Sequence, residues 1–392
     1  MFQLTNFRSL RPRHLATQAE TLEWLALAHT QAETQQAALE GRPFEPRAFL
    51  ASMQRRLARF GCGADTIAMR GHEIDDCSHQ RWHEMDVYSS AERPSAAGTR
   101  ARTKLFGRVA GRALAQLFDE TVHAPEHLIH VTCTGYEAPS AAQLLVAGKG
   151  WGSQTSVTHA YHMGCYAALP ALRMATGFEA LRAAGGGASL AAKRVDIVHT
   201  EICSLHMNPS RHEPEQLVIQ SLFADGCIGY SVSSAAASAG QSAGLSVLSQ
   251  VEWIVPDSAG SMAWLCSDFG MEMVLARDVP DKIAASLAPF VECLLERAGE
   301  TAASAKQAVF ALHPGGPKIV DQIAATLGLT EAQIAFSRAV LRERGNMSSA
   351  TLPHVWQAIV ESPRVASGEL VVSLAFGPGL TLSGAVLRKV AA

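Results

Sequence analysis

Cys165, His313 and Asn346 lie far apart in the sequence, yet their side chains could together carry out acyl transfer. Cys165 follows a glycine and precedes an Ala/Leu-rich run that predicts a helix, so its thiol is expected at a helix N-terminus. The free N–H groups and the macrodipole there favour the thiolate, which is the nucleophilic form. A histidine and an asparagine can donate hydrogen bonds to the oxyanion of an attacked thioester, or to an enolate. A Cys–His ion pair would also keep the thiolate populated at neutral pH.

Each of these residues has a simpler interpretation as well. Cys165 could be a packed core cysteine or a metal ligand, and Asn346 could be an ordinary helix cap. His159 and His162 precede the cysteine, but no carboxylate or second cysteine stands at ligand spacing, so we expect no metal. Taken alone, the residue types do not show that the three side chains meet.

Periodic apolar residues predict the elements that would position these side chains in the first half of the chain. Helices are expected over 21–40, 43–61, 99–121 and the run after Cys165. Strands are expected from residue 126 to a stop at Gly135, over 194–203 and at the end of 215–234. We also expect a helical N-terminal extension over about residues 1–45. Pro170 lies inside the run after Cys165 and should cost a backbone hydrogen bond or kink that helix.

The second half repeats the alternation of strands and helices. Strands are expected over 246–256, 270–280, 307–316, 369–377 and 380–390. Helices are expected over 281–299, 317–329 and 348–362, with a cap-like signature at the start of 330–346. A segment rich in small residues, 235–244, is the best boundary, so we divide the chain into 1–240, which carries the cysteine, and 241–392, which carries the histidine and the asparagine. The pattern predicts a layered α/β fold.

Composition excludes several classes of function. The chain has 392 residues, 48% of them hydrophobic, which is ample for a large core. A net charge of −3 and 6% aromatic residues argue against a nucleic-acid partner. No apolar run reaches the roughly 18 residues of a membrane helix, and the N-terminus lacks a secretory signal, so we expect a soluble cytoplasmic protein. The eight scattered cysteines fit reduced thiols better than disulfides or a zinc module.

Seven segments carry a family resemblance in their order along the chain. They are CTGYEAP, HMGCYAALPALRMA, SLFADGCIGYSV, VEWIVPDS, LHPGGPKIVDQI, RERGNMSSATL and AFGPGLTL. Together they closely resemble the type III polyketide synthases, the chalcone synthase-like branch of the thiolase superfamily, from about residue 45 to the C-terminus. HPGGPKI, GNMSSA and FGPGLT distinguish this branch from the related 3-oxoacyl-carrier-protein synthase III enzymes.

The resemblance implies a five-layered αβαβα fold with two similar halves, a homodimer, and no metal or organic cofactor. Cys165 matches the acyl-accepting nucleophile of the family. His313 and Asn346 match the pair that promotes malonyl decarboxylation and stabilises the enolate and the oxyanions. Phe223 matches the gatekeeper phenylalanine between the CoA tunnel and the cavity, and Met273 stands at the second gatekeeper position.

The cavity positions depart from the plant enzymes and indicate a bacterial-type enzyme rather than one with flavonoid-type activity. Trp264 replaces a small cavity glycine and should narrow the plant-type pocket. Cys133, Cys203 and His206 replace cavity threonines, and Ser348 of the GNMSSA motif is assigned to the cavity as well. Buried packing is the alternative for the two cysteines, and a hydrogen-bonded structural role is the alternative for the histidine.

Three basic residues are candidates for contacts with CoA phosphates. Arg56 and Arg59 fall near phosphate-binding positions of the family, and guanidinium groups suit phosphate well. Lys318, after the Pro/Gly turn, could also approach CoA. The alternative for the two arginines is a solvated basic helix face.

The resemblance implies iterative decarboxylative Claisen condensation. An acyl-CoA starter would load on Cys165, malonyl-CoA would extend it, and the product would cyclise, with alkylresorcinols or alkylpyrones preferred. One alternative is a malonyl-only synthase of a small polyhydroxylated aromatic, and another is a single-condensation ketosynthase that takes substrates from an acyl carrier protein. A non-catalytic acyl-binding scaffold is the alternative outside this class.

Overall fold

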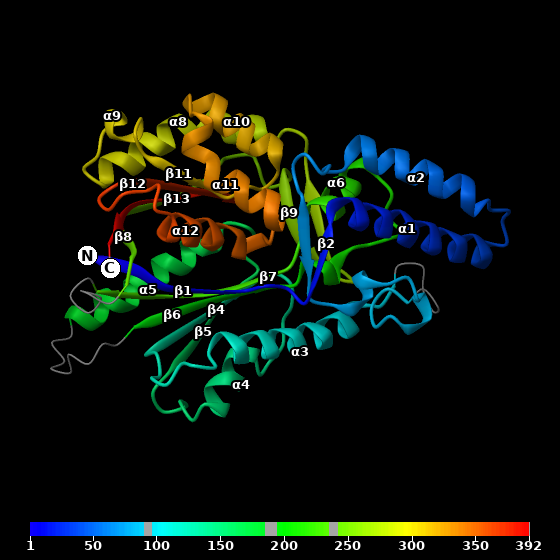
Figure 1. Cartoon of the computed structure of the whole chain (residues 1–392), viewed down its shortest axis with the longest axis horizontal. Coiled ribbons are helices and arrows are strands. Elements are labelled where there is room, and N and C mark those ends of the chain that lie inside the picture. The colour runs from blue at the N-terminus through cyan, green and yellow to red at the C-terminus, as the bar shows by residue number, and fades with distance from the viewer. Residues whose placement is uncertain (90–95, 185–193, 235–241, 392) are drawn as a thin grey trace.

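A central sheet organises the computed structural model, which describes residues 1–89, 96–184, 194–234 and 242–391 (Figure 1). Among these residues, nine strands form the sheet in the order β11-β12-β13-β8-β1-β7-β6-β4-β5. Their bounds are β1 Phe2–Leu10, β4 His127–Thr132, β5 Ser156–Tyr161, β6 Val195–Glu201, β7 Gly226–Ser234, β8 Gly244–Ile254, β11 Val309–Leu312, β12 Leu370–Gly377 and β13 Thr381–Val390. Parallel pairing joins β4 to β5 and β6, and β11 to β12, whereas the other neighbours are antiparallel.

The first strand corrects the predicted helical extension over residues 1–45. Residues 2–10 form β1, which pairs with β7 along most of its length and with β8 over Phe2–Leu4, so it joins the two halves of the sheet. The later part of the extension is helical as predicted, over residues 18–40. Leu4, however, is fully buried between partners more than 200 residues away in the sequence, which local periodicity cannot reveal.

Most helices cover and separate the strands in five layers, and the first two helices lie to one side of these layers (Figure 1). Their bounds are α1 Gln18–Glu40, α2 Pro46–Phe60, α3 Thr99–Leu117, α4 Ala141–Gly148, α5 Ala168–Ala184, α6 Pro214–Leu222, α8 Val279–Arg297, α9 Ala302–Ala305, α10 Pro317–Leu327, α11 Glu331–Arg344 and α12 Thr351–Glu361. Helix α3 packs on the first-half strands and α8 on the second-half strands, while α5 and α12 contact strands of both halves. This arrangement confirms the predicted αβαβα fold class.

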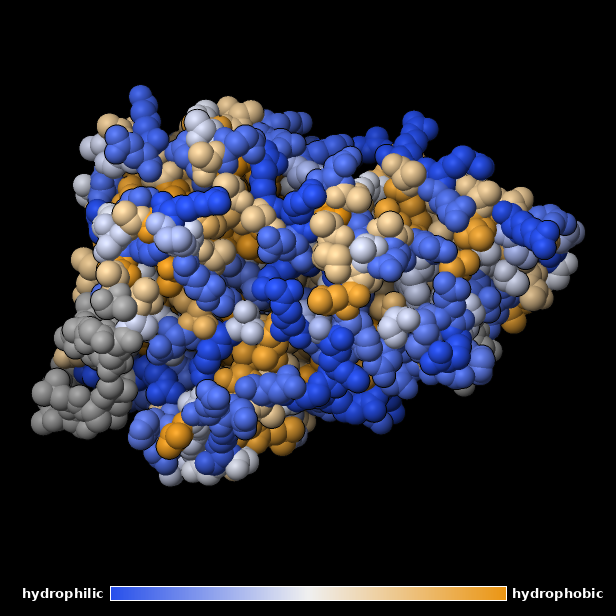
Figure 2. Space-filling view, viewed as in Figure 1, coloured by the Kyte–Doolittle hydropathy of each residue, from blue (hydrophilic) through white to orange (hydrophobic). Residues whose placement is uncertain are grey.

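The central layer explains the Ala/Leu-rich run after the cysteine. Small side chains of α5, including Ala171 and Ala175, lie in the largest core cluster with residues from both halves. A helix that contacts sheets on opposite sides needs apolar residues around its circumference, and alanines let both sheets approach it closely. Figure 2 shows that hydrophilic residues predominate on the viewed face, with smaller apolar areas between them.

Shorter elements border the site. Strands β2 (His14–Thr17) and β3 (Met69–His72) pair with each other, as do β9 (Met262–Cys266) and β10 (Met271–Leu275). Sequence periodicity indicated most helices within a few residues but missed α4, α9, β2, β3, β5 and β9. Strand β4 ends at Thr132, shortly before the predicted stop at Gly135. The predicted boundary at 235–244 lies largely outside the described residues. No helix in the described ranges has the length and apolarity needed to span a membrane.

Candidate active site

Cys165 lies in a tight turn between β5 and α5. Gly164 precedes it with a φ of 84°, and a Cβ there would lie 2.6 Å from Cδ of Pro378. A Cβ on Gly377 would lie 2.2 Å from Cδ1 of Tyr166. The FGPG motif therefore packs directly on the turn that carries the cysteine, and glycines are required at both contacts.

The position of Cys165 relative to α5 corrects the prediction that the cysteine opens the helix. The helix begins at Ala168, and the cysteine lies in the turn just before it. Pro170 is consequently the third residue of α5, where a backbone N–H would have no partner within the helix. The proline costs no helical hydrogen bond at this position and needs no kink.

His313 follows β11 directly and is held by its backbone. Its N–H donates to the carbonyl oxygen of Leu374 in β12 at 2.8 Å. The side chain is 2% exposed, and neither ring nitrogen has a hydrogen-bond partner in the described part of the chain. Burial lowers the pKa of the His313 imidazole to about 3.

Asn346 follows α11 and its cap residue Gly345, which has a φ of 73°. The amide oxygen accepts hydrogen bonds from the backbone N–H of Ser348 at 2.9 Å and from Oγ1 of Thr351 at 3.3 Å. That cap-like role fixes the orientation of the amide. Its Nδ2 group is buried and has no partner among the described residues, so it remains a free donor.

The fold brings Cys165, His313 and Asn346 into the lining of one small cavity. A larger cavity adjoins it, and Cys165, Phe223, Met262 and Met273 line both. Phe223 and Met273 therefore stand between the two cavities, as a pair of gatekeepers would. The remaining predicted cavity residues all line the larger cavity: Cys133, Cys203, His206, Trp264 and Ser348.

Sequence reasoning missed several residues of the larger cavity. Met262 and Met271 lie two positions before Trp264 and Met273 on β9 and β10. Because side chains two apart on a strand share a face, alternation around the two marked residues could have identified them. Asn208 and Arg211, by contrast, lie on a loop with no periodic signal.

Two polar side chains of the larger cavity are anchored to its walls. Nε2 of His206 donates to the carbonyl oxygen of Thr134 at 2.7 Å, and Nδ1 accepts from the N–H of Met271 at 3.1 Å. Both ring nitrogens are thus satisfied in the neutral form, and burial lowers the histidine's pKa to about 3. Nε1 of Trp264 donates to the carbonyl oxygen of Cys133 at 2.7 Å, which holds the indole in place.

Glu201 is a buried carboxyl group close to the site that the sequence did not indicate. It accepts hydrogen bonds from the N–H of Cys133 at 3.0 Å, from Oγ1 of Thr134 at 3.1 Å and from Oγ of Ser349. Burial raises its pKa to about 7. Its contacts hold the end of β4 against the 3-10 turn that follows Asn346.

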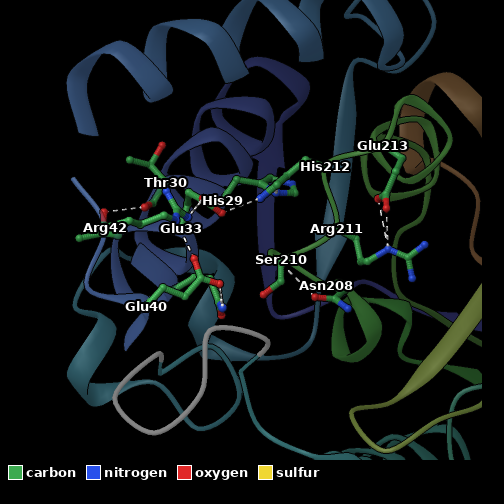
Figure 3. Close-up of polar contacts among 12 residues, drawn as sticks. His29, Thr30, Glu33, Glu40, Arg42, Asn208, Ser210, Arg211, His212 and Glu213 are labelled. Atoms are coloured by element: carbon green, nitrogen blue, oxygen red, sulfur yellow. Dashed lines mark hydrogen bonds and ion pairs between the residues drawn. The ribbon is translucent and has the colours of Figure 1, made fainter. Parts of the chain in front are cut away.

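The loop that carries Asn208 and Arg211 is tied to α1 (Figure 3). Nδ1 of His212 lies 3.0 Å from Nδ1 of His29, so only one of these two atoms can carry a proton. Nε2 of His212 lies 3.2 Å from a carboxylate oxygen of Glu33. These contacts fasten one wall of the larger cavity to the first helix.

The predicted CoA-binding residues do not line either cavity. One guanidinium nitrogen of Arg56 donates to the carbonyl oxygen of His212 at 2.6 Å. Arg59 is exposed and lies over the ring of Phe60, and Lys318 is exposed at the start of α10. Arg59 and Lys318 are therefore available to a phosphate outside the cavities, whereas Arg56 already donates one hydrogen bond within the protein.

The histidines before Cys165 have local partners. Nε2 of His159 lies 2.8 Å from Oγ of Ser140, and His162 bonds the hydroxyl of Tyr136. Within the described ranges, no three His, Cys, Asp or Glu side chains are grouped so that they could hold a metal ion.

Burial acts on the charges of Cys165 and His313 in opposite directions. It raises the pKa of the Cys165 thiol to about 12. The hydroxyl of Ser348, whose Oγ lies 4.0 Å from Sγ, opposes this shift because it can donate to the thiolate. Each group alone is therefore neutral at pH 7. The two groups line the same small cavity, and burial favours the neutral form of both.

Comparison with known protein families matches residues 98–236 to the N-terminal domain, and residues 246–391 to the C-terminal domain, of chalcone and stilbene synthases. The two segments together make up well over half of the chain. The chain therefore belongs to the chalcone and stilbene synthase family, a class of acyltransferase-type condensing enzymes that includes the type III polyketide synthases.

Two relatives illustrate the match. Probable polyketide synthase 1 of Dictyostelium discoideum is 31% identical over 271 residues, which are 67% of this chain and only 8% of that protein. Type III polyketide synthase C of Arabidopsis thaliana is 27% identical over 267 residues, which are 67% of each chain. The chain thus spans a small fraction of the first relative and two thirds of the second.

Solved structures share the whole fold. PKS-I from the brown alga Ectocarpus siliculosus has a TM-score of 0.81 at 21% identity, covering 99% of this chain and 98% of that one. The C-terminal type III domain of Steely1 from Dictyostelium has a TM-score of 0.80 at 22% identity, covering 99% of both. 1,3,6,8-Tetrahydroxynaphthalene synthase from Streptomyces coelicolor A3(2) has a TM-score of 0.76 at 22% identity, covering 100% of both. At these identities the similarity establishes the fold.

Proposed function

We propose that this protein is an iterative type III polyketide synthase that builds its product on Cys165. This proposal rests on buried donors that have no hydrogen-bond partner among the described residues: Nδ1 or Nε2 of His313 and Nδ2 of Asn346. They line one cavity together with the thiol. An unsatisfied buried donor costs about 1–3 kcal/mol, so a site that keeps such donors is suited to bind an acceptor. A thioester oxygen supplies that acceptor.

The proposed reaction has two stages at this site. In loading, the Cys165 thiolate attacks the carbonyl of an acyl-CoA starter, a new C–S bond forms, and CoA leaves as a thiol after taking up a proton. In extension, the C–C bond to the carboxylate of malonyl-CoA breaks, CO2 leaves, and the electron pair remains as an enolate. His313 and Asn346 donate to the enolate oxygen. The enolate carbon then attacks the acyl group on Cys165, which releases the sulfur for another cycle.

The larger cavity supports the proposed product class. Its lining beyond the gatekeepers includes Ile219, Met262, Phe269 and Met271, which suit an alkyl chain. We therefore prefer a fatty acyl starter and an alkylresorcinol or alkylpyrone product. A malonyl-only synthase of a small polyhydroxylated aromatic is the second candidate, because Trp264 narrows the cavity next to Cys133.

Mass spectrometry of the products tests this proposal. The protein is incubated with malonyl-CoA and a panel of starters from acetyl-CoA to stearoyl-CoA, each with labelled malonyl-CoA in a parallel run. Cyclised products that contain the starter and several two-carbon units are expected. Products extended by one unit only, or a strict need for carrier protein, would overturn iterative synthesis. If neither acyl-CoA nor acyl-loaded carrier protein leaves an acyl group on the wild-type protein, it is a non-catalytic scaffold.

The partners proposed with this function are acyl-CoA and malonyl-CoA, with an acyl carrier protein as an alternative starter donor. We propose a homodimer that acts in the cytoplasm, where CoA thioesters are available, and that needs no metal or organic cofactor. Light scattering is expected to give twice the chain mass of 41.7 kDa. Full activity after treatment with a chelator and gel filtration would support the absence of a cofactor.

His313→Gln is expected to change how the reactivity of Cys165 depends on pH. In the wild type the thiolate–imidazolium pair keeps alkylation by iodoacetamide nearly constant between about pH 6 and about pH 8. Without the imidazole, burial holds the thiol pKa near 12, so the alkylation rate is lower at pH 7 and rises about tenfold per pH unit. Peptide mapping of the alkylated cysteine measures both profiles. Parallel profiles in the two proteins would contradict the ion pair.

Trp264→Ala is expected to lengthen the products or to admit longer starters. Removal of the indole opens space next to Cys133, whose carbonyl oxygen then loses its donor. Trp264→Phe keeps most of the ring volume but not the N–H, so its product distribution should stay near that of the wild type. Liquid chromatography of products from one starter panel makes the comparison. An unchanged distribution in the alanine variant would mean that Trp264 does not limit the cavity.

A further inference from the structure

Arg70, in β3, is a buried cation that lies behind Phe223 and Asn346. Its side chain is 0% exposed, and its Nη1 donates to the carbonyl oxygens of Gln220 at 2.8 Å and Phe223 at 2.7 Å. Burial lowers its pKa to about 10, so it stays charged at neutral pH. Removing a guanidinium from water is costly, and in the described chain Nε and Nη2 have no hydrogen-bond partner. A residue kept at this cost needs an explanation.

The hydrogen bonds at the end of α6 show what the guanidinium does. In a continuing helix, the N–H of Ala224 would donate to the carbonyl oxygen of Gln220. It donates instead to the backbone oxygen of Asn346 at 2.8 Å, while the N–H of Asn346 donates to Leu222 at 3.0 Å. The carbonyl of Gln220 is thereby left without its helical donor, and Arg70 supplies one. A cation also suits the negative end of the helix dipole.

Tight packing links these segments. A Cβ on Gly345 would lie 3.1 Å from both the Cβ of Ala224 and the carbonyl oxygen of Leu222, and 3.3 Å from Cδ of Arg70. The N–H of Asp225 donates to the carbonyl oxygen of Gly71, next to Arg70, at 3.0 Å. The end of α6 is therefore fixed by β3 on one side and by the Gly345–Asn346 segment on the other.

We propose that Arg70 is a positioning residue for the condensation reaction: it holds the end of α6 so that the amide of Asn346 and the ring of Phe223 face Cys165. It lines neither cavity, so it acts through the backbone rather than by touching substrate. This inference rests on the proposed function. It predicts that loss of Arg70 impairs the step that needs the Asn346 donor more than the step that needs the Cys165 thiol.

The test compares two half-reactions in Arg70→Lys and Arg70→Met. Release of CO2 from malonyl-CoA reports on Asn346, and the intact mass of the acyl-enzyme from hexanoyl-CoA reports on Cys165. A shift of about 1 Å in a catalytic group can cost about 100-fold in rate. We expect Arg70→Lys, which keeps the charge but not the planar fork, to lower decarboxylation about tenfold and Arg70→Met about 100-fold. Loading should change by less than about threefold in both.

Arg102 provides the matched control. It is also 0% exposed, and it donates to the backbone oxygens of Ala97 at 2.7 Å and of Leu205, which lie outside the α6–Asn346 junction. Arg102→Lys should lower the melting temperature as Arg70→Lys does, without changing the ratio of decarboxylation to loading. Gly345→Ala crowds the same junction and should lower the ratio of decarboxylation to loading as the Arg70 variants do. If both Arg70 variants fail to fold, this variant tests the positioning role instead.

The possible outcomes separate the two proposals. If wild-type protein neither loads an acyl group nor releases CO2, the proposed function fails. If the wild type performs both steps but the Arg70 variants keep both, or lose both equally, Arg70 is only a structural residue. A selective loss of decarboxylation that Arg70→Lys partly rescues relative to Arg70→Met supports the positioning role.

Discussion

Cys165→Ala is expected to abolish the acyl-enzyme and to lower condensation by about 10⁴-fold or more, whereas release of CO2 from malonyl-CoA should persist. Among the described residues that line the small cavity, Cys165 supplies the thiol that can hold the growing chain as a thioester. Decarboxylation instead needs donors to the enolate oxygen, and those come from His313 and Asn346. The variant therefore separates the two stages of the proposed reaction.

Intact-protein mass spectrometry after incubation with hexanoyl-CoA measures loading, and trapped CO2 measures decarboxylation. Cys293→Ala, on α8 and away from both cavities, is the control and should load like the wild type. An acyl adduct of unchanged yield on Cys165→Ala would contradict the assignment. Peptide mapping would then show whether Cys133, the thiol on the adjoining wall, carries the chain.

Asn346→Asp is expected to lower decarboxylation by about 10²–10³-fold, the usual effect of losing one oxyanion donor. The substitution is nearly isosteric. One carboxylate oxygen can still accept from the N–H of Ser348 and from Thr351, so the turn should keep its structure. The other oxygen replaces the free N–H₂ group and faces the enolate as an acceptor, which removes a hydrogen bond and adds repulsion.

Asn346→Ala separates these two effects because it removes the donor without adding charge. It should decarboxylate faster than Asn346→Asp and slower than the wild type. Its melting temperature should be lower than that of Asn346→Asp, because alanine also removes the oxygen that accepts from Ser348 and Thr351. Initial rates of CO2 release at saturating malonyl-CoA make the comparison. Decarboxylation by Asn346→Asp within about threefold of the wild type would show that the amide does not stabilise the enolate.

Local patterns in the sequence were sufficient to predict most helices. The segments expected over 21–40, 99–121 and 317–329 correspond to α1, α3 and α10, because their apolar positions recur at helical spacing whatever lies around them. The motifs with Cys165, His313 and Asn346 likewise indicated a thioester-handling site, because few residue types can act as a nucleophile beside two donors.

The tertiary structure decided everything that depends on partners distant in the chain. Strand β1 lies in the centre of the sheet because it pairs with β7 and β8. The residues near β1 in the sequence give no sign of this pairing. Distant partners also determine how Phe223 and Met273 separate the two cavities. They likewise determine how His212 fastens one wall of the larger cavity to α1. Spacing along the chain does not encode these contacts.

Arg70 and Cys165 illustrate that difference most directly. The sequence gives no sign of a special role for Arg70. Only the folded chain shows that Arg70 donates to the carbonyl oxygen of Gln220 in place of the N–H of Ala224, which donates to Asn346 instead. The sequence by itself determined which residues could form and hold a thioester, since that follows from their chemical groups. Only the tertiary structure decided that Cys165 precedes rather than opens its helix and which donors face it, because buried hydrogen bonds between remote segments set those positions.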